Sequence, residues 1–66
     1  MTLYFLDSYK VDDITCIRED YPTTYCNNKD ALDKMVAIAK SQDRKGIVTG
    51  QAYFNANGVL VKKTTK

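Results

Sequence analysis

The chain has no histidine and no tryptophan, and its 66 residues include one proline, two cysteines and three glycines. The absence of histidine removes the side chain whose ordinary pKa suits proton transfer near neutral pH, so Ser-His-Asp triads and His-assisted cysteine nucleophiles are excluded. The glycines, Gly46, Gly50 and Gly58, are too dispersed to form a loop that cradles phosphate. These absences predict that the protein is not an enzyme.

The two cysteines, Cys16 and Cys26, allow one disulfide at most, far from the dense framework of small secreted domains. No charged segment precedes the first apolar run, and that run ends at Asp7, which is too short for a secretory signal or a membrane span. We therefore expect a cytoplasmic protein with both thiols reduced. Two cysteines without histidine also fall short of the four ligands of a structural zinc site, so we expect no metal and no cofactor.

The length of the chain predicts a single domain over residues 1–66 with a modest core. Domains this short usually need disulfides, a metal, self-association or an unusually tidy core. Because the first two aids are not expected here, self-association as a homodimer is favoured over an unusually tidy core. The adjacent carboxylates Asp12 and Asp13 are expected to form a solvated turn and not an acid–base pair.

Apolar residues at helical spacing predict a helix over about residues 28–44. Its stripe consists of Leu32, Met35, Val36 and Ala39. Asn27 or Asn28 would cap its start, and Gly46 fits a left-handed stop just past its end.

Runs of aromatic and β-branched residues predict strands on both sides of that helix. Residues 2–9 and 14–18 are expected to form a hairpin around a turn at residues 10–13, and residues 23–26 are a candidate for an extra short strand. Residues 47–54 and 59–65 flank Asn57-Gly58, the preferred sequence of a two-residue type I′ turn. The fold class is therefore α+β, in the order ββαββ, with one helix packed on one face of a small antiparallel sheet in two layers.

A two-residue turn at Asn57-Gly58 would also set the register of the second hairpin. Phe54 would then face Val61 and Ala52 would face Lys63, on the side that packs against the helix. On the outward side, Tyr53 would face Lys62 and Gln51 would face Thr64. Leu60 would join this outward side, so the predicted partner-binding residues are Tyr53, Leu60 and Lys62. The tyrosines fit an interface, but strand propensity and partial burial also account for them.

Charge is unevenly distributed along the chain. Residues 1–33 carry seven acidic and three basic side chains, whereas residues 34–66 carry one acidic and seven basic ones, for a net charge of +2. The terminal lysines Lys62, Lys63 and Lys66 therefore have three interpretations: protection of an edge strand, contacts to phosphate, or contacts to an acidic protein. The small net charge and the two arginines argue against a dedicated nucleic-acid protein.

The small size, the lack of catalytic residues and the polarised charge are similar in kind to small accessory proteins of bacteriophages and mobile elements. Such proteins often bind and inhibit a host macromolecule. No motif carries this likeness, and it transfers no functional residue. The predicted function is a non-enzymatic protein that docks on a partner protein and modulates or inhibits it, with no membrane role. A basic β-ribbon that binds nucleic acid is the alternative.

Overall fold

The computed structural model describes residues 1–65. In chain order its elements are β1 (Thr2–Val11), β2 (Arg18–Asp20), β3 (Thr24–Cys26), α1 (Lys29–Ser41), β4 (Lys45–Phe54) and β5 (Leu60–Thr65). The α+β class with one helix is therefore confirmed. The order is βββαββ and not ββαββ, because the candidate short strand over residues 23–26 is present as β3.

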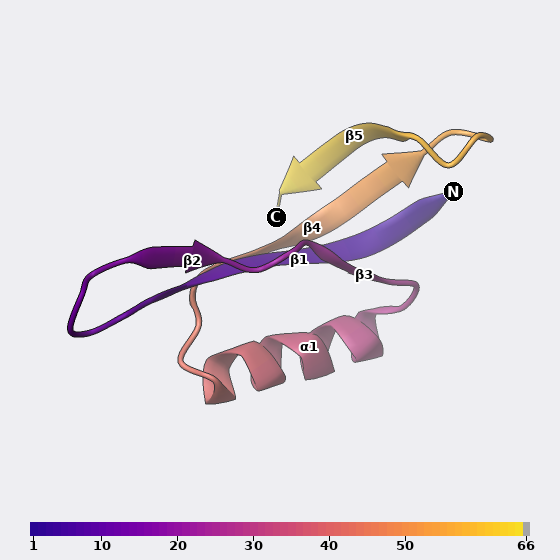
Figure 1. Cartoon of the computed structure of the whole chain (residues 1–66). Helices are drawn as coiled ribbons and strands as arrows, with labels where there is room; N and C mark the ends of the chain where they lie inside the picture. The colour runs from indigo at the N-terminus through magenta and orange to yellow at the C-terminus, as the bar shows by residue number, and fades with distance from the viewer. Residues whose placement is uncertain (66) are drawn as a thin grey trace.

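All five strands form one antiparallel sheet built around β1. One edge of β1 pairs with β4, and β5 lies beyond β4. The other edge is shared, since β3 pairs with the first half of β1 and β2 with the second half. Pro22 lies between these two short strands and has no N–H to donate, which suits a break in pairing. The helix lies on one face of the sheet, which makes two layers (Figure 1).

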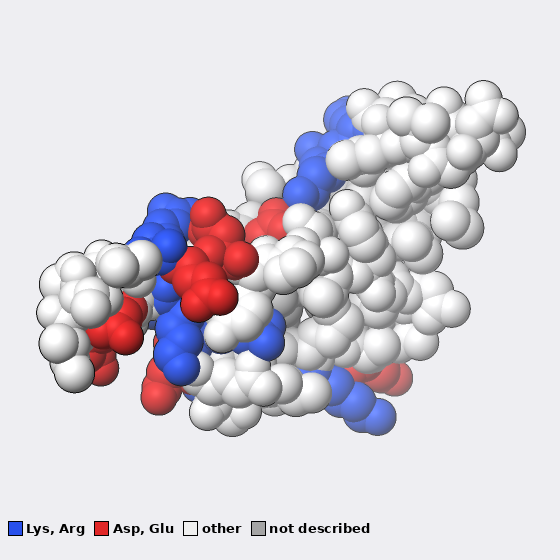
Figure 2. Space-filling model, viewed as in Figure 1, with Lys and Arg blue, Asp and Glu red and all other residues white. Residues whose placement is uncertain are grey.

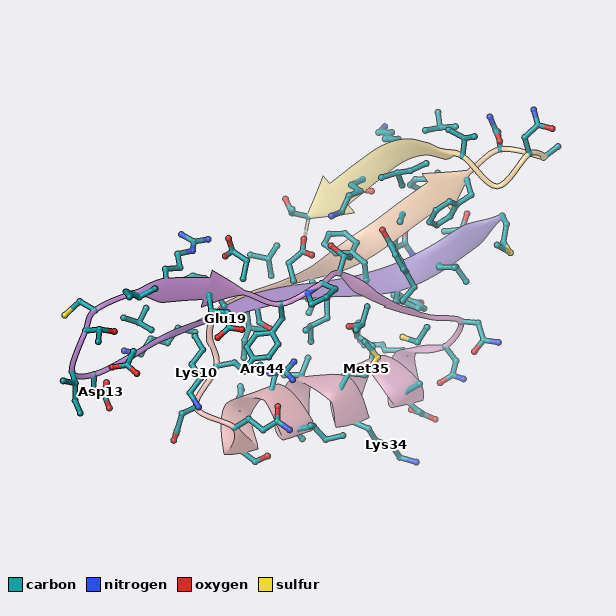
Figure 3. The ribbon with its side chains drawn as sticks, in the orientation of Figure 1. Lys10, Asp13, Glu19, Lys34, Met35 and Arg44 are labelled. Atoms are coloured by element: carbon teal, nitrogen blue, oxygen red, sulfur yellow. The ribbon has the colours of Figure 1, made fainter. Side chains whose placement is uncertain are left out.

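The helix starts and faces the sheet as its sequence predicts. The Asn28 side chain accepts a 2.7 Å hydrogen bond from the Ala31 amide, so Asn28 is the N-cap. Leu32 and Ala39 are buried. Met35, half-buried, points toward the sheet, whereas Lys34 points away from it (Figure 3). The amphipathic stripe is therefore the packing face.

The end of the helix differs from the prediction. The helix ends at Ser41, and the left-handed residue that follows it is Asp43, with a φ of 57°. A short polar side chain lets Asp adopt this region more readily than most residues. Gly46, the predicted stop, lies inside β4 at a bulge, where its φ of 59° places it against the Tyr9 ring. Asp43, and not Gly46, is therefore the left-handed residue that follows the helix.

The predicted strand over residues 14–18 is wrong except at Arg18. β1 continues to Val11, and residues 12–17 form a loop. Asp12 closes this loop, because its Oδ1 accepts hydrogen bonds from the amides of Ile14 and Thr15, at 2.8 and 2.9 Å. The local Asx turn outweighs the β propensity of the isoleucines.

The helix covers the face opposite to the one predicted. Residues paired across strands share a face, and Tyr4 pairs with Gln51. Both residues line a hollow of about 350 Å³ together with Leu32 of the helix. The helix therefore lies on the Gln51 face and not on the face of Ala52 and Phe54. The sequence pattern could not decide this, because both faces of the sheet carry apolar side chains.

The described chain is elongated, with extents of 44 × 22 × 17 Å and a radius of gyration of 13.2 Å. A compact domain of this length has a radius of gyration of about 11 Å. The excess comes from two hairpins that extend in opposite directions from the centre, β1–β2 and β4–β5 (Figure 1). A small core therefore supports two projecting ends.

Gly50 allows β4 and β5 to approach closely, and we expect Gly50→Ala to disturb this contact. A Cβ at Gly50 would overlap the carbonyl oxygen of Thr64 and press on the Phe5 ring. We expect a loss of roughly 1–3 kcal/mol in the free energy of unfolding, as in other overpacked sites. Chemical denaturation measures it, with faster exchange of the β5 amides as a second readout.

Gly58→Ala is the matched control. Gly58 has a φ of 77°, but a Cβ there would meet no atom within 4 Å. Its cost should be about 1 kcal/mol, from backbone conformation alone. A Gly50→Ala protein as stable as the wild type would contradict the close approach of the two strands.

Candidate functional site

The turn between β4 and β5 is organised by a side chain. The Gly58 amide donates to the Asn55 carbonyl and the Asn55 amide to the Val59 carbonyl, both at 3.0 Å. The Asn55 side chain accepts from the amides of Asn57 and Val59, at 2.9 and 3.0 Å. The central residues are therefore Ala56 and Asn57, with Gly58 left-handed after them. The predicted type I′ turn centred on Asn57-Gly58 is wrong, because Asn55 closes the turn earlier.

This turn shifts the register near the tip of the hairpin and leaves the rest as predicted. The confirmed pairs are Gln51 with Thr64, Ala52 with Lys63, and Tyr53 with Lys62. The register then shifts, so Phe54 pairs with Leu60 and not with Val61. Leu60 consequently shares a face with Phe54, and the predicted surface of Tyr53, Leu60 and Lys62 is divided between the two faces of the hairpin.

All three predicted partner-binding residues remain accessible. Tyr53 is 37% exposed and Leu60 is 42% exposed, and Lys62 is also exposed. The Tyr53 hydroxyl donates a 3.0 Å hydrogen bond to Gln51 Oε1, which fixes the direction of the ring. The β4–β5 hairpin extends beyond the helix (Figure 1). Tyr53 and Lys62 are paired close to its turn.

The hairpin exposes aliphatic side chains directly after its turn, at residues 59–61. Val59 and Val61 are 58% and 66% exposed, on either side of Leu60. The tip carries no acidic or basic side chain from residue 52 to residue 61, and it forms an uncharged end of the molecule (Figure 2). Exposed aliphatic side chains gathered at one end of a molecule are typical of contact sites.

Lys63 behaves differently from Lys62. Its ammonium lies 4.3 Å from the centre of the Phe5 ring and forms a 3.0 Å ion pair with Asp7 Oδ2. Asp7 also accepts a hydrogen bond from the Thr23 hydroxyl. Phe5 is fully buried beneath this lysine, although it faces away from the helix. Lys63 thus covers the second face of the sheet, with the Tyr25 and Phe54 rings nearby in a T-shaped pair.

The surroundings of Asp7 act on its pKa in both directions. Partial desolvation raises the pKa of this carboxyl, but the hydrogen bonds from Thr23 and Lys63 and the Lys63 charge together outweigh desolvation and lower it. A carboxyl whose pKa is lower in the folded protein stabilises the fold above its unfolded pKa, and this stabilisation is lost as the pH falls through the folded value.

Sequence reasoning missed a second exposed element, the loop over residues 12–17. Ile14 is 93% exposed and Ile17 is also exposed, although both belong to a residue type that is usually buried. The loop is nonetheless ordered by Asp12, whose pKa is lowered by hydrogen bonds from the Thr15 and Ile14 amides. Asp12 at the head of an Asx turn is the signal that could have revealed this loop.

The placement of possible metal ligands and the state of the thiols bear on metal and redox chemistry. No group of three or more His, Cys, Asp or Glu side chains in residues 1–65 is placed to hold a metal. Both cysteines are free thiols; Cys16 is exposed at the β1–β2 loop and Cys26 is half-buried in β3. No helix within the described part of the chain is long and apolar enough to cross a bilayer.

The ion pair between Lys63 and Asp7 should contribute measurably to stability. In a double-mutant cycle with Asp7→Ala and Lys63→Ala, we expect a coupling of roughly 0.5–1 kcal/mol, since both side chains are only about one-third exposed. The pair Arg18–Asp20, which is far more exposed, is the control and should give a coupling near zero. Equal couplings for the two pairs would contradict the special role of Lys63.

The same pair predicts the response to acid. The free energy of unfolding of the wild type should fall as the pH drops below about 4, the ordinary range of an Asp carboxyl. Asp7→Asn should have a flatter profile over this range, because the variant has no carboxylate to protonate. Chemical denaturation at a series of pH values measures both curves. Parallel curves would show that other carboxylates account for the acid sensitivity.

Asp12→Ala should loosen the loop without unfolding the domain. The amides of Ile14 and Thr15 lose their acceptor, so their hydrogen exchange should accelerate while exchange in β1 and β4 stays unchanged. Asp13→Ala is the matched control, because no hydrogen bond from its side chain is present in residues 1–65. A loop that keeps slow exchange in Asp12→Ala would contradict the Asx turn.

Comparison with known proteins assigns the chain to no family. No family model matches the sequence, no curated protein matches it, and no solved structure matches its fold. The function is therefore inferred from the β4–β5 hairpin itself.

Proposed function

We propose that the chain is a non-enzymatic binding protein that docks on another protein through the β4–β5 hairpin and thereby modulates or inhibits it. One observation carries this proposal: Val59, Leu60 and Val61 are all exposed where β5 begins, in a hairpin that extends beyond the core (Figure 1). Burying apolar surface stabilises a complex by about 25 cal/mol per Å² before the cost of association.

The tip is also held in a defined shape before it binds. The two hydrogen bonds to the Asn55 side chain fix the turn, and the hydrogen bond to Gln51 fixes Tyr53. A preordered contact surface loses less conformational entropy on binding than a flexible one. The partner would accordingly present an apolar pocket or groove to this end. Docking there would obstruct other ligands of the same pocket, which is the simplest route to inhibition.

Nucleic-acid binding through the terminal lysines has less support. Of the three candidate phosphate contacts, Lys63 is engaged by Asp7, and Lys66 lies outside the described residues. Lys62 is exposed on β5 next to Tyr53. Basic side chains elsewhere are interspersed with acidic ones, notably around β2 (Figure 2). A phosphate backbone is bound best by a continuous basic face.

The test compares three variants against the macromolecule recovered from a lysate with and without nuclease. If a protein is the partner, Leu60→Ala and Tyr53→Ala should each weaken binding by about 2 kcal/mol or more, as expected for apolar and aromatic anchors. The triple variant Lys62→Ala, Lys63→Ala, Lys66→Ala should change mainly the salt dependence. Circular dichroism and thermal melting establish that each variant is folded.

Nucleic-acid binding would give the reverse result. Nuclease would abolish recovery, and the triple lysine variant would lose affinity and flatten the salt dependence, with Tyr53→Ala and Leu60→Ala unaffected. Recovery of only a second copy of this chain, with a dimeric mass in solution, would assign the tip to a homodimer interface.

A further inference from the structure

The outer edge of β5 is a long strand edge without a neighbour in the described chain. β5 ends the sheet, pairs only with β4 and has all six residues exposed. The opposite edge of the sheet is different, because β2 and β3 contribute only three residues each and are separated by the segment containing Pro22. β5 is therefore the edge best able to accept an additional strand.

This edge is less protected than the lysines in its sequence suggest. Lysines on an edge strand normally oppose pairing with another strand. Lys63, however, crosses the sheet over Phe5 to reach Asp7, so its charge is neutralised away from the edge. Lys62 is the remaining basic side chain in the described part of β5, and it lies on the helix-bearing face beside Tyr53.

A hollow lies between the start of the helix and the part of the sheet where the middle of β4 pairs with the end of β5. Its walls are formed by Tyr4, Leu32, Lys29 and the polar or small residues Gly50, Gln51, Thr64 and Thr65. Its volume is about 350 Å³. Among the described residues, the helix packs on β1, β3 and β4 and does not contact β5, so the hollow is open between the helix start and β5. Side chains of a strand added beside β5 would find space there.

The charges on the two faces of the edge differ. On the helix-bearing face, Lys62 on β5 and Lys29 at the hollow are both basic. On the other face, Leu60 and Phe54 are apolar, and Lys63 is already paired. Successive side chains of a strand point to alternate faces. An incoming strand would thus match this edge best if acidic residues alternated with apolar ones.

We propose that β5 pairs with an extended segment of a partner protein in which acidic side chains face Lys62 and Lys29 and apolar ones face Leu60. Backbone hydrogen bonds along β5 supply affinity, and the alternation supplies specificity. The inference deepens the proposed docking function by naming the form of the partner. It requires the hairpin to be a protein-binding element, but it can be tested without the natural partner.

The probe is a capped peptide of about seven residues in which Glu alternates with Val. Titration into ¹⁵N-labelled protein should shift the amide signals of Leu60–Thr65 and slow their hydrogen exchange, with smaller changes at Tyr4 and Leu32. A peptide with Lys in place of Glu should not bind. Two further peptides carry N-methyl groups on alternate residues; because a strand pairs through one edge, only one of these two should lose binding.

Lys62→Glu should weaken binding of the Glu peptide by roughly three-fold to ten-fold and create binding of the Lys peptide. Lys40→Glu is the matched control, because it makes the same charge change on an exposed helix residue and should leave both titrations unchanged. Signal changes elsewhere, or equal binding of both N-methylated peptides, would overturn the proposal. So would β5 protection that grows with protein concentration in the absence of peptide, which would assign the edge to a second copy.

These outcomes are separate from the proposed function itself. In one outcome, Leu60→Ala abolishes binding of a protein partner but no peptide binds to the protein. Docking through the tip would then stand, and strand pairing at β5 would be excluded. In the other outcome, the Glu peptide binds at β5 but no protein partner is found whose binding depends on Leu60. Strand pairing at β5 would then stand, and docking through the tip would be excluded.

Discussion

The pairing of β1 on both of its edges holds this structure together. β1 is hydrogen-bonded to three of the other four strands, and its neighbouring residues Phe5 and Leu6 are both buried, one on each face of the sheet. Phe5 occupies the space left by Gly50 opposite it and is covered by Lys63, whereas Leu6 faces the helix side. A slip of one residue in the pairing would move Phe5 and Leu6 to the opposite faces of the sheet. The register of β1 therefore determines what is buried on both faces.

The regular elements could be predicted from the sequence, but their boundaries could not. The helix and its N-cap follow from apolar spacing and from Asn28, and the strands from β-branched and aromatic runs. Three errors have the same physical cause, which is the capacity of Asp and Asn to form local hydrogen bonds or left-handed conformations. Asp12 converts an expected strand into a loop, Asp43 replaces Gly46 after the helix, and Asn55 moves the hairpin turn.

The candidate site was predictable to the same degree. The pairing of Tyr53 with Lys62 lies far enough from the turn to survive its change, so the sequence identified it correctly. The position of Leu60 depends on the bulge, and the ion pair of Lys63 joins residues 56 positions apart in the chain. The exposed Ile14 was overlooked because its β propensity suggested a strand over residues 14–18 and not a loop. These positions depend on tertiary contacts and on hydrogen bonds within turns. A pattern of polar and apolar residues does not reveal either of them.

The central pairing also bears on the order in which the chain can fold. Residues 2–9 of β1 pair with residues 45–53 of β4, so the main strand contact closes a loop that includes β2, β3 and the helix. Closing a loop of this length costs entropy before it gains contacts, which makes such topologies slow to fold compared with helical domains of equal size. The helix and the β4–β5 hairpin can form locally, but Phe5 remains without Gly50 until β4 has been synthesised. A nascent chain would therefore expose the edge of β1 that pairs with β4, together with Phe5, until β4 has emerged from the ribosome.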